Sequence, residues 1–252
     1  MSTTEVSNPV LEFVNYFPNM LLTADEMRAA DEYFRVKLRR HNRMLHGWGV
    51  VCGGEVIALK TKWQVKVGKT YVITPAGDEI CIPEDITFDL ASDSPKAYDP
   101  CPRPTPCSPA GAVKAAEGKT IYLAVCYSEC NTRPVRIHPA GCGCGCDDSA
   151  CEYSRVRESY ELVCLDVLPE SHQKATDADS KLKKLMFEYI DKKDKNLPIP
   201  VCPPHTDDCC VVLAKITLPA KQNDPINTIV DMRRPSPSTA AMELLIQAHV
   251  RP

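Results

Sequence analysis

The sequence has no surplus of charge of either sign. Its 252 residues include 30 Lys and Arg against 33 Asp and Glu, so the formal net charge is −3. Nucleic acids and anionic membrane surfaces are bound by clustered positive charge, whereas the two signs are mixed along this chain. We therefore expect no nucleic-acid partner.

Long apolar runs are absent as well. The first five residues lack the basic and apolar stretches of a secretion signal, and no later segment approaches the ~20 apolar residues that span a bilayer. We expect a chain without a membrane-spanning segment that is made in the cytoplasm, assembles there into a particle and can later be released with it. A hydrophobic content of 44% is enough to build a core.

The common motifs of catalysis are also missing. The chain contains no Gly-x-x-x-x-Gly-Lys, Gly-x-Gly-x-x-Gly, Gly-x-Ser-x-Gly or His-Glu-x-x-His sequence, and the zinc deaminase signature is absent. His41 and His46 are five positions apart, too far round an α-helix to share a metal ion, so we expect packing or capping roles. The sequence predicts a protein that is not an enzyme.

Cysteine, in contrast, is abundant. The chain has 14 cysteines, and because cytoplasmic thiols are kept reduced, their number favours metal sites over disulfides. Two alternatives stay open: disulfides formed after release from the cell, and a redox cluster. Four cysteines lie in apolar, strand-like segments and are expected to be small core residues: Cys52, Cys81, Cys126 and Cys164.

The other cysteines lie in segments that have too few apolar residues to form a core. Residues 141–151 place four thiols within ten positions with glycines between them, which suits a loop that wraps around zinc or an iron–sulfur cluster. We expect the cysteine loops to converge on Cys142–Cys151 and to share two structural zinc sites. An iron–sulfur cluster is the alternative, and His138 and His205 are possible nitrogen ligands. The candidate ligands are Cys101, Cys107, Cys130, Cys142, Cys144, Cys146, Cys151, Cys202, Cys209 and Cys210.

The clearest secondary-structure signal is a long N-terminal helix. Thr23 and Glu26 have the spacing of a capping box, and the apolar pattern that follows predicts a helix over residues 25–46. We expect Asp31 and Arg35 to pair across one turn. The apolar stripe should pack on the chain's own sheet in preference to copies of itself in an oligomer. It consists of Met27, Ala30, Phe34, Leu38, His41 and Leu45.

The rest of the sequence predicts short antiparallel strands. Alternating segments between residues 48 and 90 indicate a β meander with a turn at Gly68-Lys69. Strands are also expected at 119–127, 160–167, 211–218 and 226–231. We expect an α+β chain in three parts: residues 1–91 with the helix and the meander, a proline-rich connection at 92–118, and residues 119–252 with a second β unit, cysteine-rich metal-binding loops, an inserted helix at 178–193 and a C-terminal helix.

Several segments resemble a family of accessory proteins from phage-tail-like contractile injection systems. The most specific segment is HNRMLHGWGVVCG at 41–53. The weaker ones, in chain order, are NYF at 15–17, LLT at 21–23, TPAGDEI at 74–80, SRVRESYEL at 154–162, VVLAKI at 211–216 and DMRR at 231–234. The resemblance implies a structural component at the baseplate or spike end of the particle, with baseplate and spike proteins as partners. The N-terminal helix, an apolar stripe at 182–190 and an apolar C-terminal helix together predict a homo-oligomer. The resemblance favours a trimer.

Two other classes of protein remain as alternatives. The first is a cytoplasmic redox metalloprotein with an iron–sulfur centre at Cys142–Cys151, which would be brown, whereas a zinc protein is colourless. The second is a zinc-ribbon adaptor for nucleic acid, although the two Cys-x-x-Cys knuckles of such proteins are missing.

Overall fold

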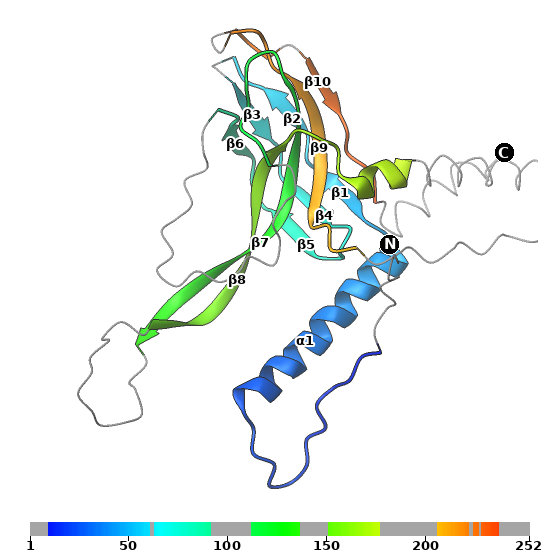
Figure 1. Cartoon of the computed structure of the whole chain (residues 1–252), viewed down its shortest axis with the longest axis vertical. Coiled ribbons are helices and arrows are strands. Elements are labelled where there is room, and N and C mark those ends of the chain that lie inside the picture. The colour runs from blue at the N-terminus through cyan, green and yellow to red at the C-terminus, as the bar shows by residue number, and fades with distance from the viewer. Residues whose placement is uncertain are drawn as a thin grey trace, which may run out of the picture.

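The structure, a computed structural model, describes residues 10–60, 63–91, 112–136, 151–176, 206–221, 224–226 and 228–236. It confirms an N-terminal helix followed by antiparallel β-sheets (Figure 1). The helix α1 (Ala24–His41) continues into a π-helical turn, η1 (Asn42–His46). The strands are β1 (Gly49–Gly53), β2 (Val56–Ala58), β3 (Gln64–Val67), β4 (Thr70–Ile73), β5 (Glu79–Ile82), β6 (Ile86–Asp89), β7 (Thr120–Arg136), β8 (Cys151–Leu165), β9 (Cys210–Thr217) and β10 (Thr228–Asp231).

The helix α1 starts at the predicted capping box. The Thr23 hydroxyl accepts the Glu26 backbone N–H at 3.3 Å, and the Glu26 carboxylate accepts the Thr23 backbone N–H at 2.8 Å. The prediction of one regular helix to His46 is wrong in its last turn, where the chain is π-helical. This wider turn places Asn42 and Arg43 in buried positions.

The first six strands form a meander of three long strands, each with a bend. Each of the three long strands contributes one half to the sheet β1-β4-β5 and the other half to the sheet β2-β3-β6. The halves join where β1 continues into β2, β3 into β4 and β5 into β6. Gly68-Lys69 is therefore the bend of the middle strand, and the predicted reversal there is wrong. Gly53 at the neighbouring bend has a φ of +68°, and a side chain there would meet the Lys69 carbonyl oxygen at 1.9 Å.

The second sheet has the order β10-β9-β7-β8, and all its strands are antiparallel. The β7–β8 hairpin pairs from Tyr122↔Leu165 to Arg136↔Cys151, so both strands are longer than predicted. Their outer halves carry few apolar residues, and the alternation that marks a strand in a sequence is lost there. This part of the hairpin extends away from the sheets (Figure 1).

One hydrophobic core joins the two β units. Side chains from β3, β4 and β5 belong to the same buried cluster as side chains from β7 and β9. The first and last described segments also meet, because Val50 in β1 forms a parallel bridge with Pro235. The fully buried members include Val65, Val67, Val72, Leu123, Val125, Val211 and Ile216.

Several sequence predictions lie outside the described residues. These are the helix at 178–193, the C-terminal helix and most of the proline-rich connection. In the part of the chain that the structure describes, no helix has the length and apolar content needed to cross a membrane.

Gly77 fixes how closely α1 approaches the β4–β5 turn, and it gives a test of this contact. Its φ is +101°, and a Cβ atom there would lie 2.2 Å from the Arg39 carbonyl oxygen of α1. Gly77→Ala should lower the free energy of unfolding by about 3 kcal/mol or more, since a positive φ and a clash with helix backbone add together.

Gly118→Ala is the matched control, because Gly118 has a φ of +68° and open space around its Cα. It should lose only about 1–2 kcal/mol. Urea unfolding of both variants measures the difference, and equal losses would show that the helix contact contributes nothing.

Candidate functional site

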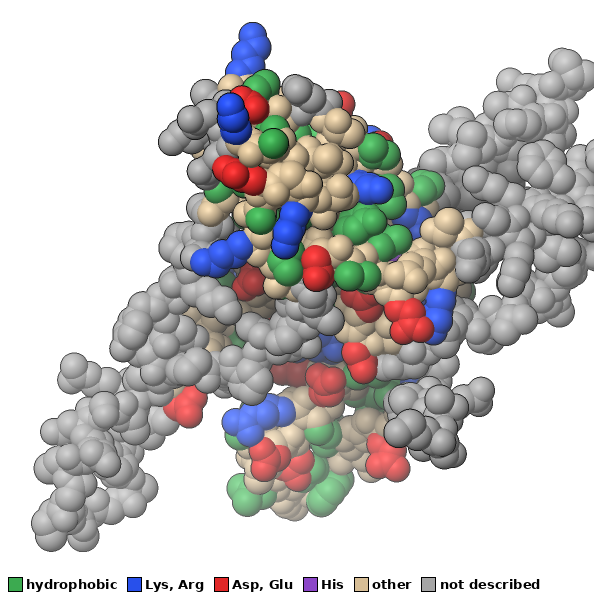
Figure 2. Space-filling view, turned by 45° about the horizontal axis from the view of Figure 1, so that its top comes forward, with side chains coloured by type: hydrophobic (Ala, Val, Ile, Leu, Met, Phe, Trp, Pro, Cys, Tyr) green, Lys and Arg blue, Asp and Glu red, His purple; other side chains and the backbone are tan. Residues whose placement is uncertain are grey.

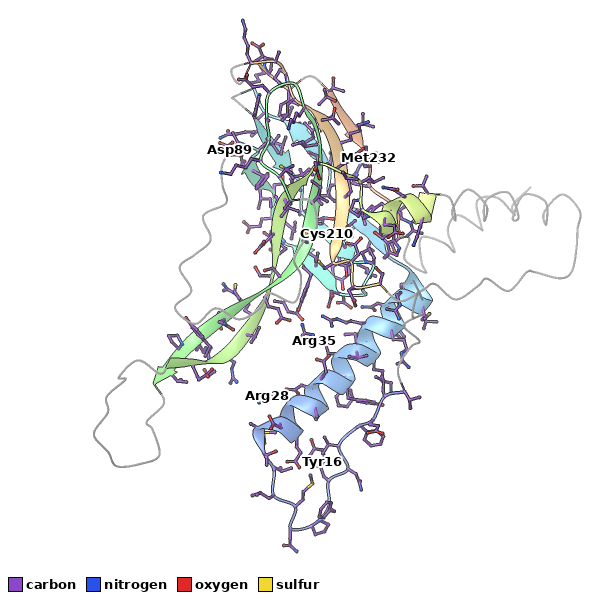
Figure 3. All side chains as sticks on the ribbon, viewed as in Figure 1. Tyr16, Arg28, Arg35, Asp89, Cys210 and Met232 are labelled. Carbon is purple, nitrogen blue, oxygen red and sulfur yellow. A yellow bond between two sulfur atoms is a disulfide. The ribbon has the colours of Figure 1, made fainter. Side chains whose placement is uncertain are left out.

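Polar side chains attach α1 to the β-sheets. Arg35 forms an ion pair with Glu129 of β7, and Arg39 Nε donates to Asp78 Oδ1 at 2.6 Å. The expected pairing of Arg35 with Asp31 is therefore wrong. Figure 3 shows Arg35 on the side of α1 that faces the sheets. This side of the helix is held by charge and hydrogen bonds, not by apolar packing.

Two further contacts complete this attachment. Asn42 Nδ2 donates to the Gly77 carbonyl oxygen at 3.1 Å and to Glu79 Oε1 at 3.0 Å. The other oxygen of Glu79 accepts the Tyr71 hydroxyl, and burial together with this hydrogen bond raises the pKa of Tyr71. Because Tyr71 stays protonated, it continues to donate to Glu79.

The apolar stripe of α1 is not covered by the sheets. None of the α1 residues is buried, and four large side chains on one side of α1 and η1 are more than half exposed. The preference for packing on the chain's own sheet is therefore wrong, because the side facing the sheets carries Arg35, Arg39 and Asn42. We call the four side chains the α1 stripe: Met27 (54% exposed), Phe34 (68%), Leu38 (53%) and Leu45 (69%).

The segment before α1 packs on a different side of the helix. The Phe13 and Tyr33 rings lie 5.4 Å apart, and a shallow groove between the segment and the helix is lined by residues that include Val10, Tyr33 and Met44. Tyr33 precedes Phe34 by one position, which turns it about 100° away from the stripe. Figure 2 shows apolar side chains exposed among charged ones at the end of the molecule below the sheets.

Two of the predicted metal ligands are in disulfides. Cys210 is bonded to Cys126 with an S–S distance of 2.06 Å, and Cys209 is also disulfide-bonded. A sulfur in a disulfide is not a thiolate, so the prediction that Cys209 and Cys210 bind metal is wrong in this structure. Cys130 is a free, half-buried thiol.

The remaining predicted ligands stay predictions. For Cys151 the structure gives only the backbone, which pairs with Arg136. The others lie outside the described residues: Cys101, Cys107, Cys142, Cys144, Cys146 and Cys202, as well as the alternatives His138 and His205. Among the described residues, no group of three or more His, Cys, Asp or Glu side chains is arranged to hold a metal ion.

The hairpin separates the two cysteine loops that were expected to converge. Residues 137–150 join the far ends of β7 and β8, whereas Cys210 lies opposite Cys126 in the body of the sheet. Ten residues of strand separate Cys126 from Arg136, which is about 33 Å. The segment at 142–151 is thus attached to the chain far from Cys209 and Cys210.

The four cysteines expected in the core behave differently from one another. Cys126 is buried but bonded to Cys210, which closes a loop of 84 residues, and a chain-entropy model assigns such a bond about 4–5 kcal/mol. Cys164 is buried as predicted, and burial raises the pKa of its thiol to about 12. Cys52 and Cys81 are exposed, so the core prediction is wrong for these two.

The π turn brings two histidines together that the sequence seemed to separate. The His41 and His46 rings make an edge contact with centroids 5.4 Å apart. The expectation that they are too far round the helix assumed α-helical geometry, whereas a π turn places residues i and i+5 on one side. The pair forms an exposed histidine contact at the end of α1.

A hydrogen-bonded chain of Ser171, His172 and Asp208 lies beside Trp48, which follows η1. Ser171 Oγ bonds Asp208 and lies 3.0 Å from His172 Nδ1, while His172 Nε2 accepts the Val212 backbone N–H at 3.0 Å. Because Nε2 accepts a backbone proton, Nδ1 carries the imidazole proton and donates to Ser171. The serine hydroxyl then donates to Asp208, so this chain holds β9 and does not activate a nucleophile.

His172 also lies where the segment after η1 meets the segment after β10. The ring centroids of His172 and Trp48 are 4.6 Å apart, and the Arg234 guanidinium lies over the Trp48 ring, 4.5 Å from its centroid. Ser236 Oγ donates to the His46 carbonyl oxygen at 3.0 Å. No local pattern in the sequence indicates this cluster, because its members come from three distant segments of the chain.

The geometry defines an α+β chain whose described surface carries one conspicuous unassigned feature, the α1 stripe. Compared with models of known protein families and with curated proteins, the chain matches none of them.

The buried His172 predicts a loss of stability in mild acid. Burial is the main cause that lowers its pKa from 6.5 to about 4, Arg234 adds to the effect, and Asp208 opposes it. The unfolded chain therefore binds a proton between pH 6.5 and pH 4 that the folded chain does not. The stabilisation is complete above pH 6.5 and is lost as the pH falls, by about 3 kcal/mol in total.

His172→Gln removes the titration while leaving an oxygen that can accept the Val212 N–H. Urea unfolding at several pH values should show that the wild type loses about 3 kcal/mol more than this variant between pH 6.5 and pH 4. Parallel curves for the two proteins would contradict the assignment of the neutral buried imidazole.

Proposed function

We propose that the chain is a non-enzymatic structural subunit of a phage-tail-like contractile injection particle, located at its baseplate or spike end. The sequence resemblance supports this proposal, and its most specific segment, 41–53, forms the joint between α1 and the first sheets. Within it, Asn42 and Arg43 are buried, and Gly49 and Gly53 lie where other backbone approaches closely. This segment therefore contains the residues that attach α1 to the first sheets.

The observation that carries the proposal is the uncovered α1 stripe. The helix has a complete capping box and a polar attachment, so it is built as a defined element, yet its largest apolar side chains face solvent. Exposed apolar patches on an ordered element are typical of surfaces that other proteins cover. Self-association and contact with baseplate and spike neighbours would cover it.

A second feature agrees with a structural role. The β7–β8 hairpin reaches beyond the sheets and, together with α1, gives the molecule two extended arms (Figure 1). Arg35 and Glu129 join these arms to each other. Extended elements of this kind reach neighbouring subunits in an assembly, whereas a small-molecule site needs an enclosed pocket.

The proposal is tested by purifying particles from cells that express the tagged chain. The wild type should sediment with the sheath and tube proteins and resist a salt wash, because apolar contacts are not screened by ions. Phe34→Glu should reduce the chain recovered with particles at least ~10-fold. Ala29→Glu, an exposed position on another side of α1, should leave recovery unchanged. A wild-type chain found only apart from particles would contradict the proposal.

We also propose that the hairpin end holds one structural zinc ion. Cys142, Cys144, Cys146 and Cys151 together supply four thiolates, which is a complete tetrahedral ligand set. Zinc would fix a segment that has few apolar residues of its own. The wide separation from Cys210 supports a local site in place of the two shared sites expected from the sequence.

Elemental analysis of protein purified under reducing conditions tests this site. At least one equivalent of zinc per chain is expected, and the Cys144→Ser, Cys146→Ser double variant should lose it. The matched control is Cys52→Ser, Cys81→Ser, which removes two exposed free thiols and should keep the metal. Less than one equivalent in the wild type, or iron in a brown protein, would contradict a structural zinc site.

A further inference from the structure

The α1 stripe has the length and exposure of a helix-pairing surface. Met27 on α1 and Leu45 on the π-helical turn η1 mark its two ends, and the α-helical part from Met27 to Leu38 spans about 17 Å. Phe34 and Leu38 lie between them, and all four side chains are more than half exposed. The segment before α1 packs near Tyr33, and the sheets contact Arg35 and Arg39, so the described part of the chain leaves this third side open.

The stripe is symmetric about its own middle. Phe34 and Leu38 are each two positions from Val36, and Met27 and Leu45 are each nine positions from it. Asp31 and His41, which border the stripe, are each five positions away. If an identical helix lies antiparallel to α1 with Val36 at the centre, every large apolar residue therefore faces another large apolar residue, and Asp31 faces His41.

The distribution of charge along α1 also favours an antiparallel arrangement of two copies. Residues 24–33 carry four acidic side chains and one basic side chain, a net charge of −3. Residues 34–43 carry five basic side chains and no acidic one; Arg35 and Arg39 form ion pairs with the sheets and Arg43 is buried. An antiparallel copy places the acidic half of each helix beside the basic half of the other. A parallel dimer or trimer would place like charges together, which is unfavourable.

We propose that a second copy of this chain covers the α1 stripe as an antiparallel helix pair with twofold symmetry. Met27 of each copy packs near Leu45 of the other, and Phe34 packs near Leu38. Such an interface is isologous, because the same surface of each copy forms both halves. The proposal extends the self-association under the proposed function, but it does not depend on the kind of particle that the chain joins.

The chain's own residues 237–252 are the competing occupant. They follow Ser236, which is bonded to His46 next to the stripe, and they contain several apolar residues. However, their charged side chains are Glu243 and Arg251 alone, too few to match the charge division of α1. The second copy is therefore the better match, and the experiment separates the two.

Sedimentation equilibrium of the full chain gives the first test. A pair of helices is a small interface, so we expect a dimer that dissociates at roughly micromolar concentration. Phe34→Glu and Leu38→Glu should each weaken the dimer at least ~100-fold, because they bury an unpaired charge in both halves. Ala29→Glu should change the dissociation constant less than ~3-fold, and circular dichroism should confirm that all three variants keep the wild-type helix content.

Photo-crosslinking then determines the orientation. A photoreactive amino acid at Met27 is placed in a mixture of isotope-labelled and unlabelled protein, so that links between copies are recognised by mass. Links to the peptide that contains Leu45 of the other copy are expected. Links between the two Met27 positions, a trimer mass, a wild-type monomer at about 200 µM, or links to residues 237–252 of the same copy would each overturn the antiparallel pair.

These outcomes are independent of particle assembly. A dimer that forms in solution but never joins particles would contradict the proposed function and leave the helix pair intact. A chain that enters particles but stays monomeric in solution would contradict the helix pair and leave the proposed function intact.

Discussion

The contact between the end of α1 and the β4–β5 turn is the constraint on which the arrangement of the molecule depends. Gly77 has no side chain, so the turn can approach the backbone of α1 at Arg39, and Arg39 and Asn42 then bond the turn from the helix side. The side of the helix that carries Arg35, Arg39 and Asn42 therefore faces the sheets. The apolar side is left facing away from the sheets, which is why a helix with an ordinary amphipathic sequence ends with its stripe in solvent.

Behind this joint, one core holds the two β units together. The bent meander and the β10-β9-β7-β8 sheet share a single buried cluster, and Cys126–Cys210 adds a covalent bond between β7 and β9. The buried imidazole of His172 also holds β9, because its Nε2 accepts the Val212 backbone N–H. The helix α1 and the β7–β8 hairpin extend from this core (Figure 1).

Local signals in the sequence were sufficient for much of the fold. The capping box at Thr23 and Glu26 located the start of α1, and alternation of apolar residues located most of the strands. The signals failed where the deciding contact was distant in the chain. Gly68-Lys69 has the composition of a turn but lies in a bend, because the strands on both sides continue to pair with the same neighbours. Asp31 was a reasonable local partner for Arg35, but in the folded chain Arg35 pairs with Glu129. Glu129 lies opposite Glu158 on β8, and the arginine offsets the repulsion between these two carboxylates.

The cysteines show most directly what each level of structure decides. The sequence by itself determined the periodicity of α1, the division of its charge into an acidic and a basic half, and the grouping of four thiols within ten positions, since all three depend only on spacing along the chain. Tertiary structure decided that Cys210 meets Cys126 across two strands, that Cys52 and Cys81 face outward, and that the α1 stripe is uncovered. The physical reason is that burial and pairing depend on which surfaces meet, and a helix with two usable sides can present either one to its own sheet.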